Sequence, residues 1–361
     1  MGIVVVLDAE QENWTGEYTP DYNRWHGFYQ RVPTLAARID AICEAAVSNC
    51  TIEGPNSETL LKFLDSITGN GKQTFKVISY NLIKSGIIGG DSFAEVIYDD
   101  SDNVENLMQL PSGNMKILFK NGVIKKYIEV DGDGKWKPEQ ILHCSWNPSG
   151  ASVHGTSVIE RLNDILIAKN QIEDDCRRIY HRYIKPIHII KIDSDDDTEI
   201  ANFKAEWAKL KNIPEADIFT TKDFVEIERA AIPEFATLKP DPWRDYLMKV
   251  ETLSTGVPEV RLGEGAQANS EATAKIQDKG FRDKVKWTQN WYEAILEKQL
   301  FPQIYPKGGN KINFSFLGES EEDAFNRYAQ AFKIISSDES IDKGKKTKVL
   351  EKLLNNMGLL K

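Results

Sequence analysis

Apolar residues recur at helical spacing in several stretches of the first 90 residues, and this pattern predicts three helices. The first starts at Pro33 and has an apolar stripe made of Leu35, Ile39, Ile42, Cys43, Ala46 and Val47. The second follows Ser57 and ends at Asn70-Gly71, with an inward face made of Leu60, Leu61, Leu64 and Ile67. The third, which Gly86 is expected to end, contains Phe75, Ile78, Leu82 and Ile83.

The segment before these helices, residues 8–30, is polar and aromatic and has little periodicity. Its aromatic residues include Trp14, Tyr18, Tyr22, Trp25 and Tyr29. We expect an extended arm that docks through these side chains.

The pattern changes to that of strands after Gly90. Residues 93–98, 115–119, 123–130 and 141–146 are predicted strands. Asn121-Gly122 is a hairpin signal between the second and the third. The first 150 residues therefore predict an α+β unit.

The middle of the chain predicts a different arrangement. Residues 156–183 carry apolar residues every three or four positions without a helix breaker, until Pro186. Such a helix would be about 40 Å long. Residues 187–238 then predict a compact α/β insert, with one helix at 198–210 and strands at 187–192, 217–220 and 224–229.

A second long helix is predicted to return from this insert. It starts at Asp241-Pro242 and ends at Gly256, and its expected inward residues are Trp243, Tyr246, Leu247, Val250 and Leu253. A glycine-rich polar loop then leads to a helix ending near Leu300, a strand at 311–317 and two C-terminal helices. An insert carried on two long helices indicates an elongated subunit, because a helix of this length extends beyond a compact domain of this size.

Charge and cysteine content narrow the functional classes. The formal net charge is -10, which argues against a protein that binds nucleic-acid phosphates tightly. It does not exclude a protein past which a polyanion such as DNA moves without being bound. The four cysteines are too few and too scattered for a disulfide framework, so we expect a reducing compartment. The N-terminal apolar run is too short for a signal peptide or a membrane span, so a soluble, unexported and unanchored protein is expected.

No motif of an enzyme or a metal site stands out. The acidic run 193–197 resembles a calcium loop, but Thr198 stands where such loops need Gly and Lys204 where they need Glu. An acidic helix start explains the run without calcium. The five histidines lack metal-ligand spacing, and no nucleophile elbow or phosphate loop is present. We therefore predict no catalysis, no cofactor and no metal. The basic cluster 343–348 is interpreted as the solvated start of the last helix, although a transient DNA contact remains open.

Four short segments occur in an informative order. They are Gly90–Asp99 (GDSFAEVIYD), Leu107–Met115 (LMQLPSGNM), Lys137–His143 (KPEQILH) leading to Gly155–Ile159 (GTSVI), and Gly256–Gly263 (GVPEVRLG). Together they resemble the portal proteins of tailed double-stranded DNA viruses, over most of the chain from about Val32 onward. The resemblance implies an α+β, elongated portal fold. Its parts would be a wing, two long stem helices, an inserted α/β clip and a short helical C-terminal crown.

The resemblance implies the following division of the chain. An N-terminal arm (1–31) precedes the wing (32–154), stem helix 1 (155–185), the clip (186–239), stem helix 2 (240–257), a tunnel loop (258–270), a wing helix and strand (271–319) and the crown (320–361). The arm matches nothing in the family, and the crown is short.

The family also implies where function would reside. The protein would form a ring, most often of twelve subunits, at one capsid vertex in the virion, and would assemble in the host cytoplasm. DNA would be packaged and ejected through its channel. Expected channel residues of the tunnel loop are Gly263, Glu264, Gly265, Gln267 and Asn269. The stem would present an acidic wall that includes Glu160, Asp164, Glu173, Asp174 and Asp175.

The expected partners follow from the same resemblance. The terminase large subunit and later a head-tail adaptor or connector protein would contact clip residues Lys211, Glu215, Asp217, Lys222, Glu226 and Glu228. The major capsid protein, the scaffold and other copies of this chain would surround the ring, double-stranded DNA would pass through it, and no membrane is implied. The alternatives are another ring-forming head-tail adaptor or scaffold without catalytic activity, and an enzyme with an unrecognised site. A simpler interpretation of the tunnel loop is that it only connects two helices.

Overall fold

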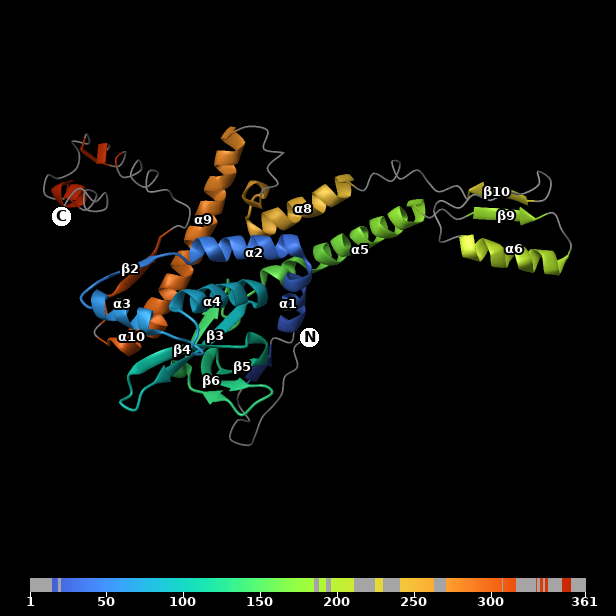
Figure 1. Cartoon of the computed structure of the whole chain (residues 1–361). Helices are drawn as coiled ribbons and strands as arrows, with labels where there is room; N and C mark the ends of the chain where they lie inside the picture. Colours follow the sequence, from blue (N-terminus) through green and yellow to red (C-terminus); the bar gives the residue numbers. More distant parts are fainter. Residues whose placement is uncertain are drawn as a thin grey trace. The chain divides into compact units, whose positions relative to one another are not determined.

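The computed structural model describes residues 15–18, 21–184, 188–192, 196–210, 225–229, 241–262, 271–306, 308–315, 329, 332–333, 335–336 and 346–351. The chain divides into two compact units. The first combines Met1–Asn163 with Glu251–Lys361, and the second is Asp164–Val250. Figure 1 shows the elements of both units.

The first unit contains four N-terminal helices, of which three were predicted. They are α1 (Tyr22–Arg31), α2 (Pro33–Ala46), α3 (Ser57–Ser66) and α4 (Phe75–Gly89). The predicted apolar stripe of α2 is confirmed, because all six of its residues are buried. Helix α3 ends before its predicted boundary. Helix α4 runs through Gly86 and ends at Gly90, whose φ of 91° is the conformation that glycine adopts without strain.

The expected extended conformation of the N-terminal arm is wrong over residues 22–31, which form α1. Tyr22, Trp25 and Tyr29 are spaced by three and four residues, so a helix places them on one side. Trp25 is buried, and the Tyr29 hydroxyl donates to Asp40 on α2 at 2.8 Å. Docking through aromatic side chains is therefore observed, but from a helix.

The two larger sheets of this unit are both antiparallel. One has the order β4-β3-β8 and contains β3 (Asp91–Tyr98), β4 (Val104–Leu110) and β8 (Ile141–Ser145). The other has the order β1-β5-β6-β7 and contains β1 (Thr15–Tyr18), β5 (Met115–Lys120), β6 (Val123–Glu129) and β7 (Lys135–Trp136). Asn121 and Gly122 form the predicted hairpin turn with positive φ of 53° and 75°.

The two sheets share an apolar core, which lies below α4 in Figure 1. It contains Phe93, Leu110, Met115, Ile117, Tyr127 and Ile141. Strand β4 contributes Leu110 although the sequence pattern did not predict this strand. The core therefore depends on the hairpin pairing of β3 with β4, a strand whose own residues show no regular alternation.

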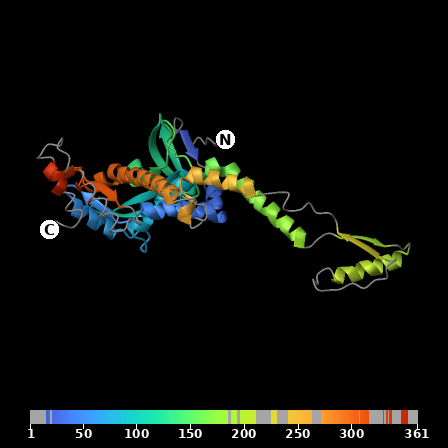
Figure 2. The same cartoon turned by 90° about the horizontal axis from the view of Figure 1, so that it is seen from above.

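A long C-terminal helix crosses α2 and packs against it (Figures 1 and 2). Helix α9 (Glu271–Ile295) continues through a π-helical turn (Leu296–Leu300) into α10 (Phe301–Ile304). After it, β11 (Lys311–Phe314) pairs with β2 (Cys50–Glu53), a strand that was not predicted. The α9 carboxylate of Glu293 accepts the Phe314 backbone N–H at 2.7 Å, which fixes this small sheet against the helix.

The second unit contains most of two helices and an α/β segment. Helix α5 (Val158–Ile184) starts in the first unit, and α8 (Asp241–Thr255) ends there. Between them lie β9 (His188–Ile192), α6 (Asp197–Leu210) and β10 (Val225–Arg229), with β9 and β10 antiparallel. The insert was predicted with these elements in this order. The predicted strand at 217–220 and the boundaries of the two C-terminal helices lie outside the described residues.

The predicted inward face of α8 is wrong at three positions. Trp243, Tyr246 and Leu253 are exposed by 53%, 50% and 83%. The buried positions are Leu247, Glu251 and Thr255, each one helical turn apart. The apolar pattern predicted that the most apolar face of α8 is buried. The structure instead buries the adjacent face, which contains the charged Glu251.

Candidate functional site

The two long helices join the first unit at a junction that we treat as the candidate functional site. Helix α5 starts there after Ser157, a buried residue whose Oγ accepts the N–H groups of Ile159 at 3.0 Å and Glu160 at 3.1 Å. The same hydroxyl donates to the Ile88 carbonyl at 2.5 Å. The start of α5 is thereby attached to the end of α4.

Two glycines allow the backbone to approach closely beside this cap. Trp146 N–H donates to the Gly90 carbonyl at 2.7 Å, and Thr156 N–H donates to the Trp146 carbonyl at 2.7 Å. A Cβ on Gly155 would overlap the Gly90 carbonyl oxygen and the Trp146 backbone. The segment that leads into α5 therefore lies directly against the ends of β3 and β8.

A buried polar network around Asp91 also holds the segment that leads into α5. The carboxylate of Asp91 accepts from His143 Nε2 at 2.9 Å, from His154 Nδ1 at 2.7 Å and from Gly155 N–H at 2.9 Å. Because a carboxylate only accepts, His143 carries its proton on Nε2. In the neutral ring, His143 Nδ1 then accepts from the Tyr127 hydroxyl at 3.2 Å.

This network shifts the pKa values of Asp91 and Tyr127. Burial opposes ionisation of Asp91, but the hydrogen bonds from His143 and His154 outweigh it and lower the pKa of its carboxyl. Burial, followed by the Asp91 charge, raises the pKa of Tyr127. The Asp91 carboxylate is thus an anion held in place by the imidazole rings of His143 and His154, and it positions the segment that leads into α5.

The end of α8 is attached by a buried ion pair. Arg38 on α2 and Glu251 are both fully buried, with 3.4 Å between Arg38 Nε and Glu251 Oε1. Arg38 Nη1 also donates to the Val257 carbonyl at 2.5 Å, beyond the helix end at Gly256. Gly256 has a φ of 74°, which turns the chain out of the helix. One arginine therefore fixes both the last turn of α8 and the segment after it.

A third ion-pair cluster joins the two sides of the predicted tunnel loop. Arg261 lies near the start of the predicted tunnel loop, before its glycine-rich part, and Asp278 on α9 follows the loop. Arg261 Nε donates to Asp278 Oδ1 at 2.8 Å, and Arg282 Nε donates to Oδ2 at 2.7 Å. Although partial burial opposes it, hydrogen bonds from Arg282 and Arg261 lower the pKa of Asp278. The chain segments on the two sides of the loop are thus tied to each other.

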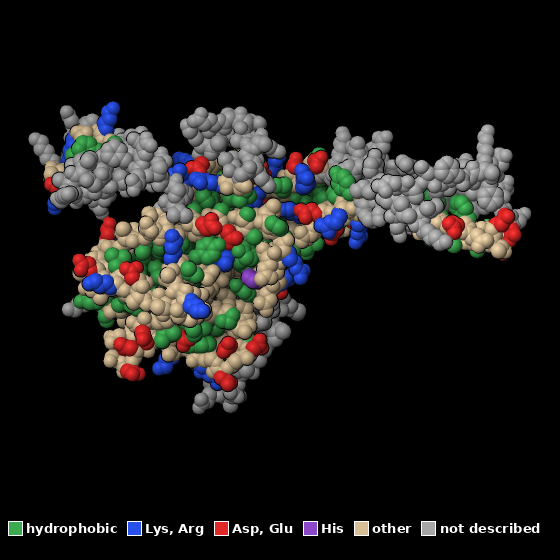
Figure 3. Space-filling model, in the orientation of Figure 1, with side chains coloured by type: hydrophobic (Ala, Val, Ile, Leu, Met, Phe, Trp, Pro, Cys, Tyr) green, Lys and Arg blue, Asp and Glu red, His purple; other side chains and the backbone are tan. Residues whose placement is uncertain are grey.

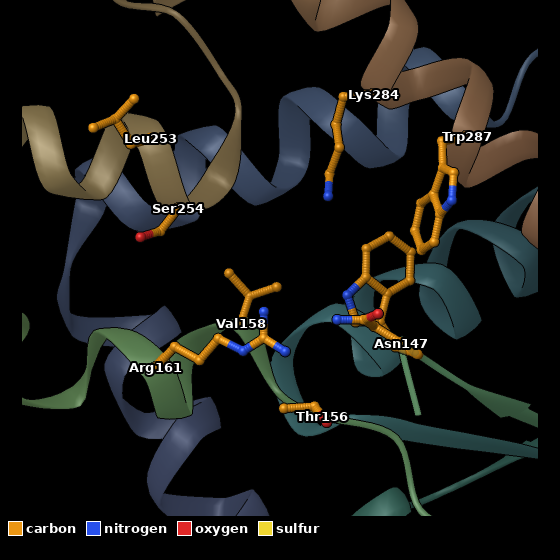
Figure 4. A pocket seen from close by; sticks show the side chains of 9 residues that line it. Asn147, Thr156, Val158, Arg161, Leu253, Ser254, Lys284 and Trp287 are labelled. Atoms are coloured by element: carbon orange, nitrogen blue, oxygen red, sulfur yellow. The ribbon is translucent and has the colours of Figure 1, made fainter. Parts of the chain in front are cut away.

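A pocket of about 390 Å³ opens within the first unit, where the start of α5, the end of α8 and the middle of α9 meet. Figure 4 shows Arg161 and Lys284 extending toward this space from α5 and α9. Its walls include Trp146, Trp287, Leu253 and Ser254. The Lys284 ammonium lies 5.3 Å from the ring centre of Trp146 and 5.2 Å from that of Trp287.

Lys284 is a cation in unfavourable surroundings. Burial, followed by the charge of Arg161, lowers the pKa of its ammonium group. None of the pocket-lining side chains is acidic. The pocket therefore combines two positive charges and indole rings with no carboxylate of its own.

The structure locates only part of the predicted site. Glu173, Asp174 and Asp175 are exposed on α5, as are Glu160 and Asp164. Asp174 forms an ion pair with Arg177 one turn away, at 3.0 Å. Glu226 and Glu228 lie on β10, paired with Lys191 and Ile189 of β9.

The remaining predicted site residues lie outside the described residues. They are Gly263, Glu264, Gly265, Gln267 and Asn269 of the loop, and Lys211, Glu215, Asp217 and Lys222 of the insert.

Sequence reasoning missed the three features that build the junction. Asp91, His143 and His154 are far apart in sequence, and so are Arg38 and Glu251. One available signal was the position of Glu251 one helical turn after the apolar Leu247, on a face that could be buried and would then require a partner for the charge. Nothing in the local pattern identified Arg161 and Lys284 as neighbours.

Among the residues that the structure describes, no group of three or more His, Cys, Asp or Glu side chains is arranged to hold a metal ion. Among these same residues, no helix has the length and apolar character needed to span a bilayer.

The sequence matches no family model and no curated protein. Solved structures are similar in fold. A chain of the neck of an empty GTA (gene transfer agent) particle, computed with C6 symmetry, aligns at 14% identity with a TM-score of 0.70, covering 92% of this chain and 93% of that one. The neck of the native GTA particle, computed with C12 symmetry, gives 15% identity and 0.69, covering 91% and 93%.

An HK97 family phage portal protein from Corynebacterium diphtheriae is also similar, at 11% identity and a TM-score of 0.52, covering 80% of this chain and 93% of that one. At such identities the likeness shows the fold. The chain therefore has a portal-type fold of mixed helices and small sheets, and the predicted resemblance to tailed-virus portal proteins is confirmed at this level.

Proposed function

We propose that this chain is the subunit of a portal ring at one vertex of a viral or virus-like capsid. The observation that carries the proposal is the portal-type fold, which extends over nearly the full length of both compared chains. Portal rings give DNA a channel for packaging and ejection and need no catalytic group. Terminase large subunit and then a head-tail adaptor would dock on this ring, while capsid and scaffold proteins would surround it.

Exposed apolar side chains on the long helices support assembly of several copies. Trp243 and Tyr246 of α8 stack at 5.2 Å between ring centres, and both are at least half exposed. Ile167 and Tyr180 of α5 are exposed by 45% and 54%. Large aromatic groups in this position are typical of interfaces, and a ring covers them without unpaired ends. The neck computed with C12 symmetry is a precedent for a ring of twelve.

The parts of a portal would map onto the chain as the resemblance in sequence implies. Residues 32–154 and 271–319 would form the wing, α5 and α8 the stem, 186–239 the clip and 320–361 the crown. Support comes from the division into two units, whose boundaries at Asn163 and Glu251 fall inside the two stem helices. The N-terminal arm would belong to the wing, because α1 docks on α2 through Trp25 and Tyr29.

The channel would be lined by the acidic stem face and the tunnel loop. Glu173, Asp174 and Asp175 are exposed, and carboxylates repel phosphates, so a DNA duplex would slide past them. On the face of the first unit drawn in Figure 3, acidic and basic side chains are interspersed. The pairs of Asp278 with Arg261 and Arg282 would hold the base of the loop while DNA moves.

The experiment compares particles made with the wild-type chain and with the Trp243→Ser/Tyr246→Ser variant. Both changes are at exposed positions, so the variant should fold but should assemble poorly. Its particles should lack DNA, as measured by absorbance ratio and extracted genome per particle. The matched control is Val123→Ser, at an exposed apolar position of β6. Full DNA content in particles made with a variant that no longer forms rings would contradict the proposal.

A further inference from the structure

We propose that the pocket between Arg161 and Lys284 receives an acidic side chain from the next copy of this chain, and that this side chain is Glu160. The inference rests on the proposed ring and deepens it by assigning one contact between neighbouring subunits.

The chemistry of the pocket selects an anion. Arg161 and Lys284 extend toward the same space from different helices (Figure 4), and no acidic residue lines it. Lys284 is partly buried, and the charge of Arg161 adds to its unfavourable surroundings. A single carboxylate would relieve the repulsion between the two cations and could accept hydrogen bonds from both.

The shape of the pocket favours a side chain over a DNA phosphate. A volume of about 390 Å³ accommodates one side chain, but a duplex cannot enter such a recess. Two large apolar residues lie at its rim, because Leu253 is 83% exposed and Trp287 is 44% exposed. Exposed tryptophan and leucine beside arginine are typical of a protein contact, whereas phosphate contacts come from open polar surfaces.

Ring symmetry limits which carboxylate can enter. Rotation about a ring axis keeps every atom at its own height along that axis, so contacting residues of neighbouring copies must have similar heights within one subunit. Glu160 meets this condition for any axis direction, because its Cα is about 3.8 Å from that of Arg161. Glu160 also points about 100° away from Arg161 around α5, so the two side chains leave the helix in different directions, as contacts with the copies on either side would require.

Glu160 is available for this role. Its side chain is exposed, and no ion pair of Glu160 is present among the described residues. Its backbone N–H is fixed by the Ser157 cap at 3.1 Å, so its position on the first turn of α5 is well defined.

The test is a charge inversion with rescue, measured on the full chain by mass photometry across a concentration series. Arg161→Glu/Lys284→Glu alone and Glu160→Arg alone should each raise the concentration for half-assembly by about tenfold or more. The triple variant Glu160→Arg/Arg161→Glu/Lys284→Glu should recover rings at close to the wild-type concentration. The matched control, Lys76→Glu/Lys279→Glu, makes the same change in net charge at exposed helical positions outside the pocket and should assemble normally.

The outcomes separate this inference from the proposed function. If the wild type forms no ring, the proposed function fails. If the wild type forms rings but Glu160→Arg assembles normally, or the triple variant is not rescued, the Glu160 contact is wrong while the ring stands. Far-UV circular dichroism of each variant identifies any loss of folding. Rescue is expected only if the two sites meet, since two unrelated defects would add.

Discussion

Asp91 is the residue on which the junction most depends. It is buried at the start of β3 and binds three donors from two other segments of the chain. Two of these donors, His154 and Gly155, lie just before α5. Loss of the carboxylate would leave several buried donors without an acceptor.

Asp91→Asn should therefore lower the free energy of unfolding by about 3 kcal/mol at neutral pH. The folded-state pKa of Asp91 is lowered, so its stabilisation is complete above the ordinary carboxyl pKa of about 4 and is lost as the pH falls through the lowered value. Urea denaturation at several pH values between about 2 and 7 measures both effects. The variant should lose less stability on acidification than the wild type. Asp131→Asn, in an exposed turn, is the control. Equal acid sensitivity of Asp91→Asn and wild type would count against the network.

The second prediction at the residue scale concerns the stability contributed by the buried ion pair of Arg38 and Glu251. Arg38→Met leaves a carboxylate buried and should destabilise the protein by about 3–5 kcal/mol. The double variant Arg38→Met/Glu251→Leu should lose less than the sum of the single variants, because both charges are gone. A double-mutant cycle by urea denaturation measures this coupling. Arg31→Met, at an exposed site on α1, should change little. Additive losses would contradict a direct pair.

At the scale of elements, helices with a one-sided apolar stripe were predictable. The stripe of α2 and the extents of α5 and α8 follow from local spacing. Strand β2 was missed because it is short and pairs with β11, which lies far away in the sequence. Strand β4 follows β3 in a hairpin and was missed because its buried residues do not alternate with exposed ones. The inward face of α8 was assigned wrongly because Glu251 is buried by an arginine more than 200 residues away, which no local pattern contains.

Gly155 gives a prediction about how β3, β8 and α5 fit together. Gly155→Ala would push a methyl group into the Gly90 carbonyl, which is rigid backbone, so the melting temperature should fall by several degrees. Gly280→Ala in α9 meets no atom within 4 Å and should be neutral or stabilise by about 0.5–1 kcal/mol. Differential scanning calorimetry compares them. A Gly155→Ala protein as stable as Gly280→Ala would refute the close approach.

The tunnel loop is tested by deleting Gly265–Asn269 between its tied ends. Because Arg261 and Asp278 keep the flanking segments together, the shortened chain should still form rings. Capsids carrying it should assemble but fail to package or retain DNA, measured as genome copies per particle. Normal packaging would reject the tunnel-loop assignment.

At the scale of the whole molecule, an acidic composition is compatible with a role in handling DNA. A net charge of -10 disfavours tight phosphate binding, which suits a channel through which DNA must move. The exposed Trp243, Tyr246 and Leu253 are unfavourable in a monomer and favourable in a ring. The sequence predicted the helices that carry these residues, but only the structure identified which of their faces are exposed.

The central claim is that copies of this chain close into a ring around a channel. Cryo-electron microscopy of the purified full-length chain tests it most directly. We predict closed rings with cyclic symmetry, most often of twelve copies, around an axial opening wide enough for a DNA duplex. Monomers at every soluble concentration, or assemblies without an axial opening, would contradict the claim.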